Sequence, residues 1–207
     1  MSQRNELVEF FKSRETILAL LKEQGYDVSN YENQSMNQVS AMHKEKQLDM
    51  LVESETGKKA YVKYHLAKTL SATNVYNYID DLINIDEVLQ KSDDIIIIMK
   101  DEPTDSLVKA LKNIWKQDGI FVTVHATKRL LFNILNHELV PPHRIMNEEE
   151  TEAFKEKFKI THLTMIPDIG RFSPVALAIG MRPGQVCEIM RASNTAIQVP
   201  FYRVCSN

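Results

Sequence analysis

Residues 94–124, DIIIIMKDEPTDSLVKALKNIWKQDGIFVTV, decide the fold of the first part of this chain. Their apolar run at 95–98 is short, β-branched and bounded by charges, which is typical of a central strand covered on both faces. Thr104 or Asp105 then begins a helix whose apolar residues repeat at helical spacing as far as Gly119. A second strand follows over 120–124. Strand, helix and strand in this order predict a crossover unit, and therefore an α/β domain with a mixed sheet.

Upstream of this unit, the periodicity of apolar residues and the turn signals predict four further segments. They are a helix over 6–24 closed by Gly25, a loop or extended excursion over 29–45, a β-hairpin of 48–52 and 60–66 that turns at Gly57, and a helix from Ser71 to about Leu89.

The character of the chain changes near residue 135, because Pro141-Pro142 can neither continue a helix nor sit in a central strand. We therefore expect two domains, 1–135 and 136–207. Three elements are predicted in the second, which makes it a small α+β unit. They are a helix from the Asn147 cap to about Phe158, a short helix from Ser173-Pro174 to Gly180, and a hairpin of 185–192 and 198–205 that turns through 193–196.

Composition sets broad limits on function. The chain has 207 residues, 43% of them hydrophobic and 26% charged, as expected of a globular protein. Its net charge of −3 belongs to residues 1–137, because eight acids balance eight bases in 138–207, and a non-specific nucleic-acid binder is usually more basic. No apolar run could span a membrane and no signal-peptide core follows the first residues, so an intracellular protein without a membrane partner is expected.

The two cysteines, Cys187 and Cys205, are too few for a four-thiolate zinc site. In the expected hairpin they are diagonal neighbours about 7 Å apart. Buried, reduced thiols are the expected state.

Asp49 and Lys63 offer the strongest hint of enzymatic chemistry. Their arrangement on the first hairpin resembles nucleases in which two acids hold a divalent metal beside a lysine. The second acid would stand at position 61, which is Tyr, and a phenol does not replace a metal-holding carboxylate at neutral pH. A scaffold of that shape without its metal site is the preferred interpretation. A metal-dependent α/β nuclease using Asp49 and Lys63 stays as the alternative.

Other catalytic patterns are not supported. His137-Glu138 is followed by its next histidine, His143, six residues later and across two prolines, which excludes the shared helical face of zinc proteases. No Gly-rich phosphate loop is present, so nucleotide hydrolysis has no support. Taking these patterns together, we expect no catalytic residue, metal, cofactor or small-molecule substrate. The hydroxyls of Thr104 and Ser106 could face a phosphate, but neighbouring acids oppose this and ordinary helix capping by Thr104 is favoured.

The segment from His137 to Val204 resembles the assembly domain of the fifth shared subunit of eukaryotic DNA-directed RNA polymerases, a subunit that has an archaeal counterpart. The resemblance covers about seventy residues and rests on an ordered set of motifs. The set is His137-Glu138-Leu139-Val140-Pro141 with His143, Ser173-Pro174-Val175-Ala176, Gly180, Gly184-Gln185-Val186, Arg191 with Ser193 and Thr195-Ala196, and Tyr202-Arg203.

The resemblance implies that this assembly domain packs against the largest polymerase subunit. It also implies an N-terminal α/β jaw, nuclease-like but inactive, near downstream duplex DNA. Similarity in the jaw is fainter and is carried by the opening helix, Gly25-Tyr26 and the strand-turn-helix around Thr104. The family usually has aspartate at Ser173, glutamate at Pro142 and proline at Asp105. This divergence suits a polymerase encoded by a large DNA virus.

We therefore expect a non-catalytic polymerase subunit whose partners are the largest subunit, other polymerase subunits and, weakly, DNA. Thr104 and Ser106 would lie near DNA. The protein would be located in the nucleus if it is cellular, and in the cytoplasm or the virion if a large DNA virus encodes it. The motif residues carried over are Pro141, His143, Gly180, Gly184, Gln185, Arg191 and Arg203. Gly184 would ease a tight turn and the two arginines would suit a polar interface, although the glycines and prolines could equally only shape the domain. Arg191→Glu is expected to weaken association with the largest subunit. A free-standing interaction module is a third interpretation.

Overall fold

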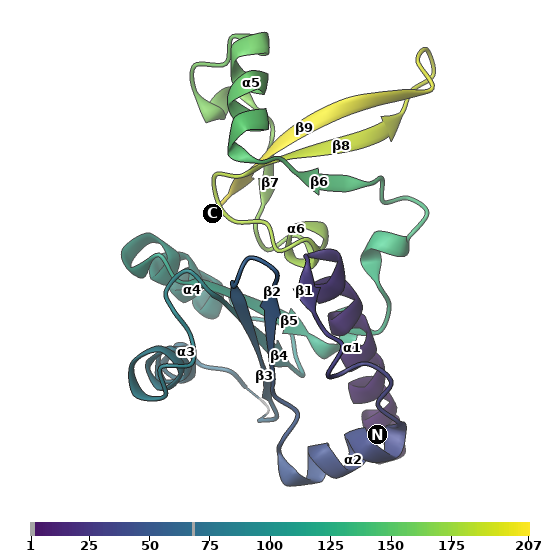
Figure 1. Cartoon of the computed structure of the whole chain (residues 1–207), viewed down its shortest axis with the longest axis vertical. Helices are drawn as coiled ribbons and strands as arrows, with labels where there is room; N and C mark the ends of the chain where they lie inside the picture. The colour runs from purple at the N-terminus through teal and green to yellow at the C-terminus, as the bar shows by residue number, and fades with distance from the viewer. Residues whose placement is uncertain (1–2, 68) are drawn as a thin grey trace. The chain divides into compact units, whose positions relative to one another are not determined.

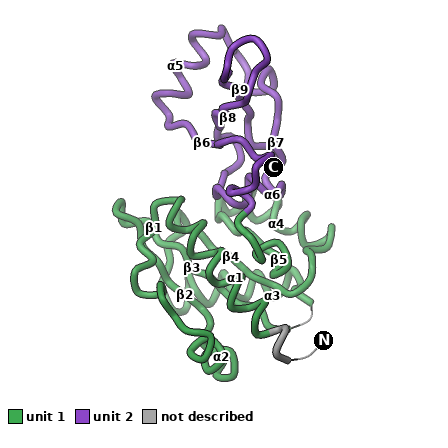
Figure 2. Tube along the Cα trace, turned by 90° about the vertical axis from the view of Figure 1, so that its right-hand side faces the viewer, with its two compact units in different colours: residues 1–133 green, residues 134–207 purple. Residues whose placement is uncertain are grey.

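The structure is a computed structural model that describes residues 3–67 and 69–207, so Met1, Ser2 and Lys68 of the expected N-terminal domain lie outside the described residues. Two compact units divide the chain, Met1–Asn133 and Ile134–Asn207 (Figure 2). The division falls two residues before the position expected from the sequence.

The first unit is built on a five-stranded sheet in the order β1-β2-β3-β4-β5. Its strands are β1 (Tyr26–Asp27), β2 (Met50–Ser54), β3 (Lys59–His65), β4 (Asp94–Met99) and β5 (Phe121–Ala126). The pairs β1–β2 and β2–β3 are antiparallel, whereas β3–β4 and β4–β5 are parallel. The expected mixed sheet and the expected hairpin are therefore confirmed, and all six residues of β4 are buried, as its apolar run predicts.

Helices cover both faces of this sheet. They are α1 (Gln3–Glu23), α2 (Met36–Glu45), α3 (Ala72–Asp80), which continues as the π-helical turn η1 (Asp81–Ile85), and α4 (Asp105–Asp118), and the short 3-10 turn η2 (Thr127–Leu130) follows β5. Figure 1 shows α3 and α4 on one side of the strands and α1 on the other. None of the helices described is long and apolar enough to cross a bilayer.

The crossover from β4 through α4 to β5 is confirmed. Thr104 caps α4 through its hydroxyl oxygen, which accepts a hydrogen bond from the Leu107 N–H at 3.4 Å. Gly119 ends the helix with a φ of 69°, in the left-handed region that glycine adopts without strain. The helix signals at both ends were therefore sufficient to locate this element.

The expectation of a loop or extended excursion over 29–45 is wrong for its second half, which is helix α2. Ser35 and Gln38 form a reciprocal cap: the Ser35 hydroxyl accepts from the Gln38 N–H at 3.3 Å, and the Gln38 side chain accepts from the Ser35 N–H at 2.7 Å. Val39 is the buried residue of this helix. Because this helix buries so little apolar surface, its sequence shows no sustained periodicity of apolar residues, which explains the wrong expectation. The Ser-x-x-Gln spacing was nevertheless a signal for the start of a helix.

The expectation that the helix from Ser71 continues to about Leu89 is also wrong. Ser71 is the N-cap, but regular helix ends at Asp80 and the π-helical turn ends at Ile85. Beyond it, the N–H groups of Val88 and Leu89 both donate to the carbonyl oxygen of Leu82, at 3.0 and 3.1 Å. This turn brings Leu89 back into the core, where it is 3% exposed. Apolar residues therefore recur as far as Leu89 although the helix has ended, because a reversal of the chain, and not another helical turn, buries Leu89.

The second unit contains a four-stranded sheet in the order β6-β8-β9-β7. The strands are β6 (His143–Ile145), β7 (Asp168–Gly170), β8 (Val186–Ala192) and β9 (Gln198–Ser206), and the helices are α5 (Glu148–Phe158) and α6 (Pro174–Ala178), with 3-10 turns at Ile134–Asn136 (η3) and Leu163–Met165 (η4). The expected helices and the β8–β9 hairpin are confirmed. The two outer strands were not expected, because three residues are too short to show an alternating pattern.

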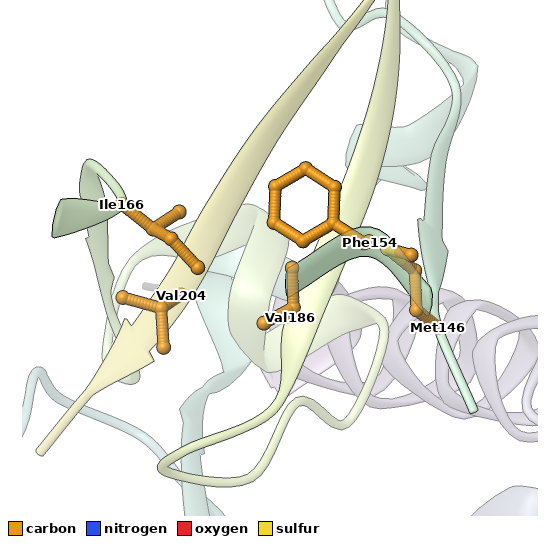
Figure 3. Close-up of a cluster of buried hydrophobic side chains, with 5 residues drawn as sticks. All are labelled: Met146, Phe154, Ile166, Val186 and Val204. Carbon is orange, nitrogen blue, oxygen red and sulfur yellow. The ribbon is translucent and has the colours of Figure 1, made fainter. Parts of the chain in front are cut away.

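Each face of this second sheet carries its own apolar cluster. Phe154 of α5 packs with Val186 and Val204, and Met146 and Ile166 complete this cluster, as Figure 3 shows. Ala176 of α6 belongs to the cluster on the other face, which contains Cys187, Cys205, Met181 and Ile189. Side chains alternate along β8 and β9, so neighbouring residues such as Val186 and Cys187 serve opposite clusters.

Candidate protein-binding face

Strand register in the second unit brings together three of the residues singled out in the sequence. In the β8–β9 hairpin Arg191 lies opposite Val199, Ile189 opposite Phe201, and Cys187 opposite Arg203. Because successive side chains point to opposite faces, Arg191, Phe201 and Arg203 share one face. The β6 strand adds His143, which lies opposite Ile189. We call the set His143, Arg191, Phe201 and Arg203 the cationic face.

Phe201 lies between the two arginines of this face. The guanidinium carbon of Arg191 is 5.1 Å from the centre of the Phe201 ring, and that of Arg203 is 5.5 Å from it. Both distances suit cation–π contact, which holds a planar guanidinium over a ring. Arg203 also donates from Nη1 to the carbonyl oxygen of Asp168 at 2.9 Å. Within the described part of the chain, neither arginine forms an ion pair with a carboxylate.

His143 lies at the edge of the cationic face. Its Nδ1 is 2.6 Å from the carbonyl oxygen of Pro141, which can only accept, so this nitrogen donates. Partial burial lowers the pKa of His143, and the nearby charges of Arg203 and Arg191 lower it further, although the bond to Pro141 opposes them. The neutral imidazole is therefore favoured next to the arginines, which leaves the two guanidinium groups as the charges of this face.

The opposite face of the same sheet has a different charge arrangement. Arg144, the neighbour of His143 on β6, donates from Nη1 to both carboxylate oxygens of Glu150 at 2.8 Å. Its Nη2 lies 3.1 Å from Oε2 of Glu188, whose other oxygen accepts from the Tyr202 hydroxyl at 3.1 Å. Arg144 is thus paired with two carboxylates, whereas in the described part of the chain Arg191 and Arg203 are paired with none.

Exposed apolar side chains adjoin the cationic face at the tip of the hairpin. Ile197 is 92% exposed and Val199, opposite Arg191, is 41% exposed. Large aliphatic groups beside unpaired arginines are a composition found where proteins bind one another.

The other motif residues of this unit lie in turns. Gly180 has a φ of 65° and Gly184 a φ of 90°, and the Gly184 N–H donates to the carbonyl oxygen of Cys205 at 2.9 Å. The Gln185 side chain accepts from the Arg182 N–H at 2.7 Å. Gly184 and Gln185 thus bond to the end of β9 through Cys205, whereas the Gly180 N–H donates to the Leu177 carbonyl oxygen at the end of α6.

Both cysteines are buried and unbonded to each other. Arg203 lies opposite Cys187 in the hairpin, which makes Cys205 the diagonal neighbour, as predicted. Burial raises the pKa of Cys187, and it raises that of Cys205 to about 11. Thiols in this environment are protonated and unreactive at neutral pH.

Asp49 and Lys63, the residues of the nuclease alternative, do lie together in the first unit. Lys63 Nζ is 2.6 Å from Asp49 Oδ2, and the Tyr64 N–H donates to Oδ1 at 2.9 Å. Tyr61 also donates its hydroxyl to Oδ2, at 3.3 Å, and burial followed by the charge of Asp49 raises the pKa of Tyr61 to about 12. Both carboxylate oxygens are therefore engaged by this chain. Across residues 3–67 and 69–207 no group of three His, Cys, Asp or Glu is arranged to hold a metal ion.

Thr104 and Ser106, the residues expected near DNA, lie exposed at the start of α4. Their hydroxyl oxygens are 3.0 Å apart. Glu102 lies just before them and pairs with Arg129 at 2.8 Å. The hydroxyls are thus engaged in capping and with each other, beside a carboxylate.

Sequence reasoning missed Phe201, although it is the residue that brings the two arginines together. The alternation Phe201-Tyr202-Arg203, aligned with Arg191 across the expected hairpin, contained a signal for a shared face. The expected strand bounds already imply the observed register, with residue 192 opposite residue 198, so the shared face could have been predicted from the sequence.

The architecture defines a two-unit α/β protein whose smaller unit presents an unpaired cationic and apolar face. Residues 132–205 match the family model described as RNA polymerase Rpb5, C-terminal domain. Over 73 residues the chain is 48% identical to the DNA-directed RNA polymerase subunit Rpo5 of Pyrococcus horikoshii, which is 35% of this chain and 88% of that relative. The Rpo5 subunit of Thermococcus celer is 43% identical over 79 residues, 38% of this chain and 94% of that relative.

A third relative matches both units. The chain is 24% identical over 205 residues to the DNA-directed RNA polymerases I, II, and III subunit rpabc1 of Dictyostelium discoideum, which is 99% of this chain and all of that relative. The chain belongs to the family of the fifth shared subunit of DNA-directed RNA polymerases, as the motifs of residues 137–204 indicated.

Proposed function

We propose that this chain is a non-catalytic subunit of a multisubunit DNA-directed RNA polymerase, and that its second unit docks on the largest subunit of that enzyme. The observation that carries the proposal is the match of residues 132–205 to the Rpb5 C-terminal domain model, together with the similarity to relatives that are themselves named as polymerase subunits. The catalytic centre and its metal would belong to other subunits.

The geometry of the second unit supports a docking role. Its helices pack on opposite faces of one sheet through the clusters that contain Phe154 and Ala176. Packing on both faces therefore holds the base of the long β8–β9 hairpin in place. The hairpin presents Arg191, Val199 and Phe201 on a rigid strand pair. A preformed surface of this kind binds a partner at a small entropic cost.

The first unit would act as a jaw near downstream duplex DNA. Support comes from the full-length similarity to rpabc1, which extends through both units. Its sheet would be a nuclease-like scaffold without activity, because Asp49 is engaged by Lys63, Tyr61 and the Tyr64 backbone. The contact with DNA would be weak and would involve the α4 start at Thr104 and Ser106.

The cellular location would follow from the polymerase. A cellular enzyme would place the chain in the nucleus, and an enzyme encoded by a large DNA virus would place it in the cytoplasm or the virion. Divergence at Pro142, Ser173 and Asp105 favours the viral case.

Affinity purification of the tagged, full-length chain from the cells that naturally produce it tests the proposal. Mass spectrometry is expected to recover the largest polymerase subunit in near-equal amount, together with the other subunits. Recovery without any polymerase subunit contradicts the proposal and favours a free-standing interaction module.

The jaw assignment needs a separate experiment. A photo-reactive cross-linker attached at Ser106 in the assembled polymerase is expected to label duplex DNA downstream of the catalytic centre. The matched position is Lys157, exposed on α5, where the same cross-linker should label little DNA. Equal labelling at both positions argues against a DNA-proximal first unit.

A further inference from the structure

Among the residues that the structure describes, Arg191 and Arg203 of the cationic face have no acidic partner, and we infer that this face binds an acidic segment of the neighbouring polymerase subunit. This inference rests on the proposed function, because it specifies the chemistry of the docking partner. The segment would place carboxylates against Arg191 and Arg203 and an aliphatic group against Val199.

The first argument is geometric. Arg191 and Arg203 hold their Cζ atoms 5.1 and 5.5 Å from the Phe201 ring centre, which restrains both guanidinium planes. A guanidinium has five N–H donors in a fixed fork that matches a carboxylate. Arg203 uses Nη1 for its bond to the carbonyl oxygen of Asp168. The described residues therefore leave most of the donors of both side chains for an external acceptor.

The second argument concerns charge. On the opposite face of the sheet the Arg144 guanidinium is paired with the carboxylates of Glu150 and Glu188. The cationic face contains no such acid, and its charges are complementary to an acidic surface. The neighbouring His143 is kept neutral by burial, which lowers its pKa, and so it adds no further charge.

The third argument distinguishes a protein partner from a nucleic acid. Val199 and Ile197 are 41% and 92% exposed at the tip of the same hairpin, and a polyphosphate backbone would leave these aliphatic groups in water. Phosphate-binding surfaces are also usually extended and basic, whereas residues 138–207 carry balanced charges. An acidic peptide segment with apolar residues satisfies both the arginines and the aliphatic side chains.

The test is affinity purification of full-length tagged variants from native cells after nuclease treatment. The double charge reversal Arg191→Glu with Arg203→Glu is expected to lower recovery of the polymerase by about tenfold or more. Lys157→Glu, an exposed reversal on α5, should recover as much polymerase as the wild type. Hydrogen exchange of the β8–β9 amides must match the wild type in each variant, which separates lost docking from lost folding.

A conservative variant identifies the partner. Arg191→Lys with Arg203→Lys keeps both charges, so its recovery should lie well above that of the charge reversal. A carbodiimide can then activate carboxylates that are in direct contact with the introduced amines. The amine attacks the activated carboxyl group, so that an amide bond forms and the carbodiimide, having taken up the elements of water, leaves as a urea. Mass spectrometry of the linked peptides is expected to show an Asp- or Glu-rich segment of a polymerase subunit.

Each contrary outcome is distinct. Equal recovery with the charge reversal and the wild type overturns the acidic-partner inference and leaves the proposed function intact. The acidic-partner inference is also overturned if the lysine variant recovers as little polymerase as the charge reversal does. It is overturned as well if nuclease treatment abolishes the recovery of polymerase by the wild type. A wild-type chain that recovers no polymerase overturns both.

Discussion

Lys63 Nζ lies 2.6 Å from Oδ2 of Asp49, and this ion pair ties strand β3 to the residue just before β2. Both side chains are partly shielded from water, with exposures of 30% and 21%. The nuclease alternative assigns catalysis to these same two residues, so removal of the pair separates a structural from a catalytic role.

Lys63→Ala is expected to lower the free energy of unfolding of the first unit by about 1 to 2 kcal/mol, because it leaves the Asp49 carboxylate without its counter-ion. The single tryptophan, Trp115 on α4, reports this unfolding by fluorescence in urea. Lys109→Ala removes an exposed lysine from α4 and should change the stability little.

The same variant tests the nuclease alternative. Purified wild-type protein incubated with duplex DNA and magnesium or manganese is expected to leave the DNA intact. Cleavage by the wild type that disappears with Lys63→Ala would show an active site at Asp49 and Lys63.

Gly184→Ala is expected to destabilise the second unit by about 1 to 2 kcal/mol, because the backbone φ of 90° is unfavourable for any residue with a Cβ. No heavy atom lies within 4 Å of the added Cβ, so the cost comes from the backbone and not from a clash. Gly170→Ala has equally open space without a positive φ, and it should cost much less. Hydrogen exchange of the β9 amides measures both; equal effects would contradict the backbone explanation.

Phe154→Ala is expected to cost about 3 to 5 kcal/mol, because it empties the centre of the cluster in Figure 3. The ring is 8% exposed and lies 4.2 Å, centre to centre, from Tyr202. Phe158→Ala, on the same helix but 54% exposed, provides the control and should cost far less. Loss of hydrogen-exchange protection in β8 and β9 with the first variant alone is the expected result.

Acidification is expected to destabilise the first unit through His125. Burial lowers the pKa of this residue to about 4, with a smaller contribution from Arg129. The unfolded chain, with an ordinary pKa of about 6.5, binds a proton before the folded chain does, so stability is lost as the pH falls from about 6.5 toward 4. The free energy of unfolding is expected to fall by about 2 kcal/mol between about pH 7.5 and about pH 5.

Trp115 fluorescence in urea at the two pH values measures this loss. His125→Gln should remove most of the pH dependence, whereas His162→Gln, which replaces an exposed imidazole in the second unit, should keep it. An unchanged slope in the first variant would assign the acid sensitivity to other groups.

Isolated protein is expected to bind duplex DNA weakly and with strong salt dependence, because the net charge of −3 repels phosphate. Fluorescence anisotropy of labelled DNA at about 50 and 200 mM salt measures this. Tight binding at the higher salt would contradict the charge argument.

Local sequence was sufficient to predict the elements whose ends carry their own signals. Thr104 and Gly119 bound α4, Asn147 starts α5, and Ser173 starts α6. These residues satisfy or terminate the hydrogen bonding of the nearest helical turn, so their effect does not depend on distant parts of the chain. The ordered motifs from His137 to Arg203 could likewise be recognised in the amino-acid sequence alone, and they indicated the polymerase family.

Tertiary structure decided what depends on distant residues. Helix α2 buries Val39 and little else, and Leu89 returns to the core by a turn onto Leu82. The cationic face exists because the β8–β9 register sets Arg191 and Arg203 on the same side as Phe201. The expected hairpin already implied this register, but only the folded structure shows both guanidinium groups within 5.5 Å of the Phe201 ring centre, because packing rather than strand alignment selects side-chain rotamers.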